Sequence, residues 1–306
     1  MAWRRLPEMK HNLSLKNCPH PSKKYWLFIL GTALIIMSFG YHKWHIKLGP
    51  TTDNGKWYVV HKYELRKGAH HTNHARIFGK FVRGYNYYIL KGIDRVQATA
   101  PEGGGYFTGM TDRPTESPIG YELKIFGKSL LDPPRTTSYC SGASYGAFIE
   151  GLNRIYHCGI DSLDFDHYET LRMQEINGGR RNDGIKFWGH WNADGFGNHF
   201  ALVQYSGMGT EIQPNNARPG DFVNISWKKG GGHSVVFLGW RKDRAGKKYI
   251  VYWSSQKGTE GYGDQVVSLE RIESIKVVRL THPENLFHFN IEARVSTKIE
   301  GDIINF

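Results

Sequence analysis

The chain has 306 residues, 40% hydrophobic and 14% aromatic, with 40 Lys or Arg against 28 Asp or Glu and a net charge of +12. This composition excludes a disordered chain and supplies enough apolar residues for a sizeable core. The positive charge favours an anionic neighbour such as lipid headgroups or cell-wall polymer. No basic cluster interleaved with aromatic residues is present, so a nucleic-acid partner is not expected.

The first 41 residues indicate export. Residues 25–41 form an apolar run without charges, and the basic residues that precede it face a single acid, Glu8. A run of this length is near the lower limit for crossing roughly 30 Å of hydrocarbon. The basic flank places residues 1–24 in the cytoplasm as a tail and the rest outside. We expect a single-pass anchor in the cell membrane; the alternative is a signal peptide cleaved near Gly40, which yields a secreted protein.

The three cysteines are not expected to form a disulfide. Cys18 precedes the apolar run, whereas Cys140 and Cys158 are exported together. The apolar residues between the latter two recur at helical spacing. Such a helix separates the two sulfurs by roughly 25 Å, far beyond disulfide reach. Cys140 is therefore predicted to be a free thiol.

The exported part divides into a helical first half and a β-rich last third. Residues 42–75 read as a linker with an edge strand near 56–63, followed by a helix that ends before Pro101. We assign residues 76–285 to one domain with an insert at 161–218, and residues 286–306 to a C-terminal extension.

The last third alternates as β-strands do. Strands are predicted at Phe222–Trp227, His233–Trp240 and Tyr249–Ser254, and two more within 264–272 and 274–280. Short glycine-containing turns join the first three, which predicts an antiparallel meander. Helices followed by an antiparallel sheet make the fold class α+β.

A cysteine at a helix start is a candidate nucleophile. Ser138 is expected to cap the helix, placing Cys140 in its first turn, where the helix dipole favours a thiolate. His233 follows a triple glycine and shares a strand face with Val235 and Phe237, so a helix packed on that face would bring Cys140 beside it. The residue that orients the imidazole is then Gln256, with Ser254 as the alternative, because both lie on one face of the next strand.

Two motifs carry a resemblance to a family. "YCSGASYGAF" at 139–148, followed by "RPGDFVNISW" at 218–227 and "GGHSVVFLGW" at 231–240, resembles the NlpC-type papain-like cysteine peptidases, close to the CHAP amidases. The resemblance covers residues 100–280 and implies a papain-like core with the nucleophile-bearing helix packed on an antiparallel sheet. It implies Cys140 as nucleophile, His233 as base and peptidoglycan peptides, or another peptide or amide, as substrate. The chain departs from the family in having Tyr139 where an Asp is usual, and in the long insert.

Aromatic residues are candidates for substrate binding. Tyr139 adjoins the cysteine, and Trp188 and Trp191 belong to "FWGHWNADGFGNHF", which either forms a stacking wall beside the groove or packs in the core. His70, His71 and His74 lack a metal-binding motif and are read as a solvated linker cluster, so no metal or cofactor is expected.

Three other functions stay open. The same scaffold suits a non-catalytic cell-wall-binding domain, or an acyltransferase in which an amine replaces water. Ser144 stands in a G-x-S-x-G sequence, typical of α/β-hydrolases. That motif requires an apolar parallel strand before the serine, and the preceding segment, with two prolines, supplies none.

Overall fold

The computed structural model describes residues 70–107, 119–133, 136–157, 163–177, 181, 186–188, 197–243 and 245–293. All of them belong to the unit His45–Phe306, the larger of the two units into which the chain divides. The apolar run 25–41, the strand expected near 56–63, Cys158 and Trp191 lie outside the described residues. Among the residues described, no helix has both the length and the apolar character to cross a bilayer.

The helical first half is more interrupted than the sequence predicts. A short helix and a 3₁₀ turn precede the main helix, because the backbone becomes extended at Val82, with φ −125° and ψ 158°, two residues before a left-handed Gly84. The first helix begins inside the segment expected to be a linker. The helices are α1 His74–Phe78, η3 Gly79–Phe81, α2 Asn86–Thr99, α3 Cys140–Ile155, α4 Phe165–Leu171 and a π-helical segment, η4 Phe200–Tyr205.

The sheet matches the predicted meander. All strands predicted in the last third are present, and every pairing is antiparallel, so the α+β class is confirmed. The strands are β1 Leu123–Ile125, β2 Lys128–Leu131, β3 Gly209–Ile212, β4 Phe222–Trp227, β5 Gly232–Lys242, β6 Lys248–Gln256, β7 Gly261–Ser268 and β8 Ile272–Leu280. β1 and β2 form a separate pair, and the six-stranded sheet has the order β3-β8-β4-β5-β6-β7. The remaining 3₁₀ turns are η5 Pro214–Asn216, η6 Lys257–Thr259, η7 Leu269–Arg271 and η8 Pro283–Phe287.

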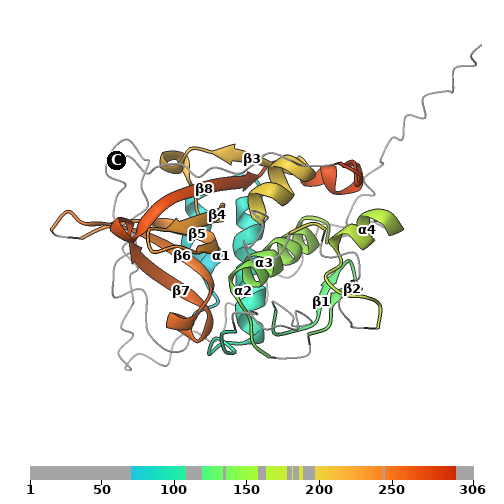
Figure 1. Ribbon diagram of the computed structural model, residues 1–306, viewed down its shortest axis with the longest axis horizontal. Helices are drawn as coiled ribbons and strands as arrows, with labels where there is room; N and C mark the ends of the chain where they lie inside the picture. The colour runs from blue at the N-terminus through green and yellow to red at the C-terminus, as the bar shows by residue number, and fades with distance from the viewer. Residues whose placement is uncertain are drawn as a thin grey trace, which may run out of the picture. The chain divides into compact units, whose positions relative to one another are not determined.

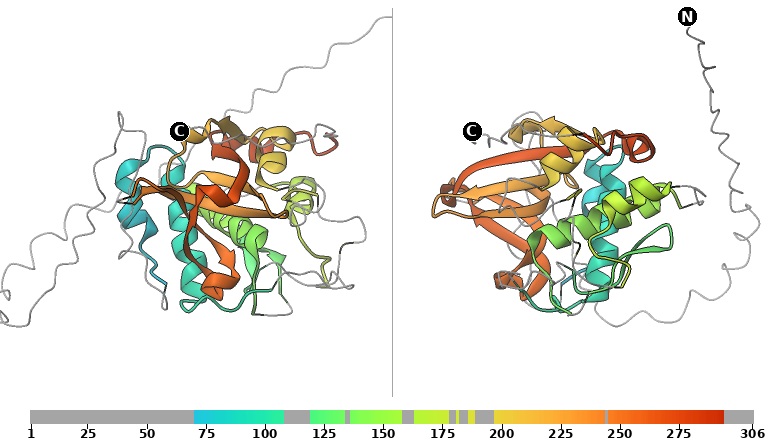
Figure 2. Two further views of the ribbon diagram at one scale, coloured as in Figure 1. Left: turned by 60° about the vertical axis from the view of Figure 1, so that its left-hand side comes forward. Right: turned by 45° about the vertical axis from the view of Figure 1, so that its right-hand side comes forward.

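Both faces of the sheet are buried. Val236 and Leu238 of β5 belong to the core shared with the helices, whereas Val235 and Phe237 belong to a second core on the other face. Figures 1 and 2 show α2 and α3 on one side of the sheet, with β1, β2 and α4 beyond α3. Successive side chains of a strand point to opposite faces, so β5 contributes to both cores.

Two helices approach closely at a glycine. A Cβ placed on Gly92 of α2 would lie 2.2 Å from the backbone oxygen of Ala147 in α3. Glycine therefore sets the distance between α2 and α3. This contact holds α3 against the rest of the helical layer.

The insert and the C-terminal extension complete the core. Trp188 and Met208, from the insert, and Leu286 and Phe289, from the expected extension, are all buried in the core of the helical side. Neither segment is therefore a peripheral addition to the domain.

Candidate active site

Cys140 is the first residue of α3. Tyr139, with extended backbone at φ −142° and ψ 176°, is the N-cap residue and makes no side-chain cap. The expected cap at Ser138 is wrong, because its hydroxyl donates to Oγ of Ser255 on β6 at 2.8 Å. The predicted helix start is nevertheless confirmed, and Cys140 is a free cysteine.

The thiol lies among backbone N–H groups. Burial raises the pKa of the Cys140 thiol, while the nearby backbone N–H groups of Ser234, Ser141 and Cys140 itself lower the pKa by less. The side chain is only 8% exposed. The group is therefore a thiol at neutral pH, and the expected resting thiolate is wrong because desolvation outweighs the main-chain dipoles.

Three tyrosines lie within electrostatic range of the sulfur. Burial, and after it the charge of a Cys140 thiolate, raises the pKa of Tyr106 and Tyr139. For Tyr252 of β6, burial raises the pKa most and the same thiolate charge adds to it. Tyr139 was expected to bind substrate, but it is 3% exposed and is part of the wall around the thiol. Tyr106 is only half-buried, so it is the member of the group with access to solvent.

His233 contacts Gln256, as the sequence predicts. Ring atom Nε2 lies 3.3 Å from Oε1 of Gln256. The amide of Gln256 is fixed because its Nε2 donates to the Gly263 oxygen at 3.1 Å and to Oγ1 of Thr259. Since Oε1 can only accept, the His233 proton resides on Nε2 and Nδ1 has the free lone pair. Ser254, the alternative, instead donates to the backbone oxygen of Ser234 at 2.7 Å.

The imidazole belongs to the sheet face opposite α3. Its ring lies 5.4 Å from that of Tyr252 and 6.1 Å from that of Trp227. Helix α3 contacts the other face, where Oγ of Ser144 lies 2.8 Å from Oγ of Ser234. The expectation that the helix packs on the His233 face is therefore wrong. Burial lowers the pKa of His233 to about 4, against a smaller rise from the Gln256 hydrogen bond.

The main-chain N–H of Ser234, which lies near the thiol, and the imidazole of His233 belong to neighbouring residues of β5. The pairing of β5 with β6 ends at Val236↔Trp253. Beyond that pair, the N–H of Ser234, one residue from His233, lies near enough to Cys140 to lower the pKa of the thiol. Among the hydrogen bonds of these described residues, none joins the sulfur to the imidazole. The surroundings of Cys140 and of His233 therefore include neighbouring residues at the same end of β5.

The remaining predicted binding residues are not at this site. Trp188 is 1% exposed, and its ring stacks on Phe148 at 5.2 Å and meets Phe222 edge-on at 5.3 Å. It is a core residue, and the stacking wall is wrong for it. Ser144 is fully buried in α3, with its hydroxyl bonded to the backbone oxygen of Ser141 at 3.0 Å. It does not stand on a strand-to-helix elbow.

The sequence reasoning missed two partners of the cysteine. The N–H of Ser234 carries no side-chain signature, because any residue other than proline supplies one. Tyr106 follows a triple glycine, and Gly104 forms an isolated bridge with Gly261 at the start of β7. The available signal was an aromatic residue that directly follows a run of glycines. Such a run lets the backbone approach another segment closely.

The histidines of the expected linker are not a solvated cluster. His74 is buried, with Nδ1 2.8 Å from Asp94 on α2 and Nε2 2.7 Å from Asp264 on β7. Burial lowers the pKa of His74, but the two carboxylates raise it more, to about 9. His71 also contacts Asp264, at 2.7 Å. These residues connect the start of α1 to two distant elements.

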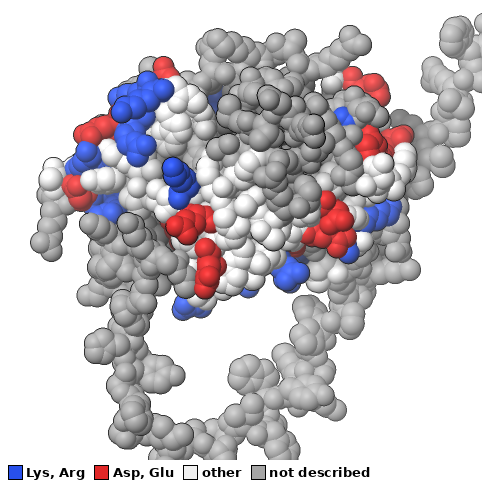
Figure 3. Space-filling model, turned by 60° about the horizontal axis from the view of Figure 1, so that its bottom comes forward, with Lys and Arg blue, Asp and Glu red and all other residues white. Residues whose placement is uncertain are grey.

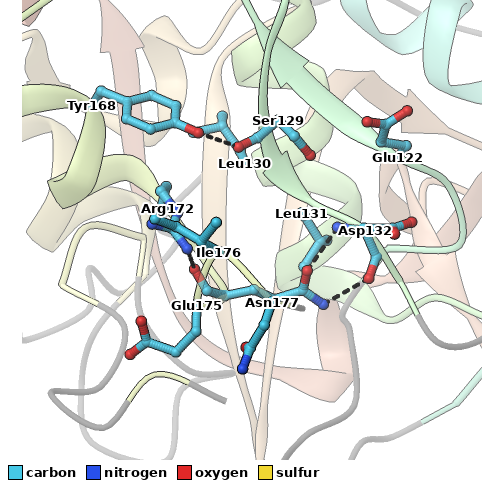
Figure 4. Close-up of a pocket in the computed structure, with 11 residues that line it drawn as sticks. Glu122, Ser129, Leu130, Leu131, Asp132, Tyr168, Arg172, Glu175, Ile176 and Asn177 are labelled. Atoms are coloured by element: carbon cyan, nitrogen blue, oxygen red, sulfur yellow. Dashed lines mark hydrogen bonds between the residues drawn. The ribbon is translucent and has the colours of Figure 1, made fainter. Parts of the chain in front are cut away.

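A pocket of about 330 Å³ lies away from the cysteine. Figure 4 shows its walls from β2, α4 and the segment after α4, with Arg172 turned to the backbone of that segment. Its polar groups already bond one another: Tyr168 donates to the Ser129 oxygen, and Gln174 bonds Asp132 in both directions at 2.7 and 2.8 Å. None of the residues expected in the site lines it.

No family model, curated protein or solved structure matches the chain.

Proposed function

We propose that this protein is a papain-like cysteine hydrolase that cleaves an amide bond, with Cys140 as nucleophile, His233 as base and Gln256 as positioning residue. One observation carries the proposal. A free thiol at the first residue of a helix lies near the backbone N–H of Ser234, and Ser234 adjoins a histidine whose tautomer is fixed by a glutamine.

The main-chain N–H groups around the sulfur suit acyl transfer. The first N–H groups of a helix have no partner inside the helix. Those of Cys140 and Ser141, with that of Ser234 on β5, lie near enough to the sulfur to lower the pKa of the thiol. When the sulfur attacks a carbonyl carbon, the same donors are in reach of the oxygen that becomes negatively charged. Fixed donors of this kind stabilise an oxyanion without reorganising.

The reaction starts from a neutral pair. Nδ1 of His233 accepts the thiol proton as the sulfur bonds to the carbonyl carbon, which requires the ring and the thiol to come into direct contact when substrate binds. The C–N bond then breaks, the amine leaves with the proton from Nδ1, and a thioester remains. Water gives a proton to Nδ1 and its oxygen bonds to the carbonyl carbon. The C–S bond breaks, and the proton returns to the sulfur.

Peptidoglycan peptides are the proposed substrate. The support is the motif resemblance, the apolar run at 25–41 that indicates export, and the net charge of +12, which suits an anionic wall or membrane surface. The face in Figure 3 carries Lys and Arg toward its left side with acidic groups between and beside them, so the face is not uniformly basic. The cleavage is placed outside the cytoplasm, with residues 25–41 as the membrane contact.

Digestion of purified peptidoglycan tests the proposal. The full chain in detergent should release soluble fragments, identified by mass, that Cys140→Ala does not release. Cys140→Ser is the matched control for shape, and it should also be inactive because a hydroxyl is a far weaker nucleophile than a thiol. Undiminished release by Cys140→Ala would contradict the assignment.

A non-catalytic wall-binding domain is the second candidate. Burial of both groups favours it, because Cys140 and His233 are 8% and 7% exposed and each is neutral at neutral pH. A binding domain should sediment with insoluble peptidoglycan and release nothing soluble, and Cys140→Ala should bind as well as the wild type. Release of fragments by the wild type alone excludes this candidate.

A further inference from the structure

Three segments distant in sequence converge on His74. Asp264 of β7 accepts from His71 and from His74, with both N···O distances at 2.7 Å. Asp94 of α2 lies 2.8 Å from the other nitrogen of His74. The rings of His71 and His74 are stacked with their centroids 4.3 Å apart. Two imidazoles and one carboxylate therefore face a common point.

This arrangement has the dimensions of a metal site. One ligand atom from each of His71, His74 and Asp264 lies within 4.8 Å of the others. In a tetrahedral zinc site with bonds of 2.0–2.1 Å, the donor atoms are about 3.3 Å apart. The two N···O distances of 2.7 Å are about 0.6 Å shorter than that value, so the Asp264 carboxylate has to move outward by about that amount when an ion enters between the donors. Two histidines and a carboxylate are a donor set that zinc and similar divalent metals use.

The outer shell of such a site is already built. Oδ1 of Asp94 lies 2.8 Å from Nδ1 of His74 and also accepts the His74 N–H at 2.7 Å, while Oδ2 accepts the N–H of Ala75 at 3.1 Å. Asp94 is thereby held in place, and Nδ1 of His74 carries a proton directed to it. A carboxylate that accepts from one ring nitrogen orients the other toward a metal. Nε2 of His74 is that other nitrogen, and it faces Asp264.

The site is open on the side of His71. The His71 side chain is 27% exposed, against 1% for His74 and 7% for Asp264. Solvent therefore reaches the point between the ligands past His71, which leaves room for a water molecule as fourth ligand. Coordination through Nε2 of His71 moves its proton to Nδ1. The 3.2 Å bond in which the Asn73 N–H donates to that nitrogen is then lost.

We propose that His71, His74 and Asp264 bind a divalent transition-metal ion of the zinc class, with Asp94 as the positioning residue of His74. The ion takes the place of the proton that His74 shares with Asp264. It ties the segment before α1 to β7, the strand beside the one that bears Gln256. Cys140 and His233 are not among its ligands, so the site is independent of the proposed hydrolase chemistry.

Metal binding to the full chain tests the site. The protein is stripped with EDTA, dialysed against buffered zinc and analysed for bound metal, and its thermal unfolding is followed with and without zinc. The wild type should bind one zinc ion per chain and unfold at a higher temperature when loaded. His71→Ala, which removes a partly exposed ligand, should abolish stoichiometric binding. Asp94→Asn should weaken it by about 10–100-fold.

His282→Ala is the matched control. His282 is 58% exposed and lies 3.1 Å from Glu284, a histidine–carboxylate pair outside the cluster. This variant should bind zinc as the wild type does. Equal binding by His71→Ala and His282→Ala would overturn the site, as would a wild type that binds no zinc; in either case the cluster is a metal-free ion pair.

Discussion

Protonation of His233 should weaken the fold. Its pKa is about 4 in the folded chain against an ordinary value of 6.5, because burial disfavours the charged ring. Above pH 6.5 the ring is neutral in both states and adds no pH dependence. As the pH falls from 6.5 to 4, the unfolded chain binds a proton that the folded chain does not, so stability falls. A difference of roughly 2.5 pKa units corresponds to about 3 kcal/mol when the loss is complete.

The effect is measured against His233→Asn, which keeps a polar group that can donate to Gln256. Urea unfolding of both proteins at pH 7.0 and pH 4.5 gives four free energies of unfolding, and titrating groups common to both proteins cancel. Between these pH values the wild type should lose about 2.5 kcal/mol more than the variant does. An equal loss would show that burial does not lower the pKa of His233. A smaller loss in the wild type would mean an imidazolium paired with the Cys140 thiolate, and would refute the neutral pair.

Three further outcomes are expected. Gly92→Ala should destabilise the protein by about 2 kcal/mol in urea unfolding, because overpacking against the Ala147 oxygen outweighs the gain in helix propensity. Gly146→Ala meets only side-chain atoms, the nearest 3.3 Å away, and should lose less; equal losses would contradict the helix contact. Iodoacetamide should label Cys140 slowly at pH 7 and faster as the pH rises past 9, and fast labelling that ignores pH would indicate a thiolate. Gln256→Ala should lower kcat about 10²-fold with little change in KM if the amide positions the base, whereas an unchanged kcat would deny that role.

The local elements could be predicted from the sequence. The helix from Cys140 and the strands of the last third follow from short-range periodicity, which depends only on neighbours along the chain. The contact between His233 and Gln256 follows as well, because adjacent antiparallel strands joined by a short turn have few possible registers. The division of the first helix depends on the extended backbone at Val82, and nothing in the apolar spacing marks it.

Long-range packing decided the rest. Residues 235–238 of β5 are all apolar and all buried. The alternation of polar and apolar residues therefore does not show which face of the strand packs against α3. In the structure, His233 belongs to the face opposite the helix. A backbone N–H has no sequence signature, so the Ser234 donor to Cys140 emerged only where β5 and β6 separate. Asp264 meets His71 and His74 across about 190 positions of the chain. The sequence by itself set the helix that begins at Cys140 and the presence of the strands in the last third. Contacts between elements set the hydrogen-bond partners and the charge state of each candidate site residue. These contacts depend on which apolar faces pack against one another in three dimensions.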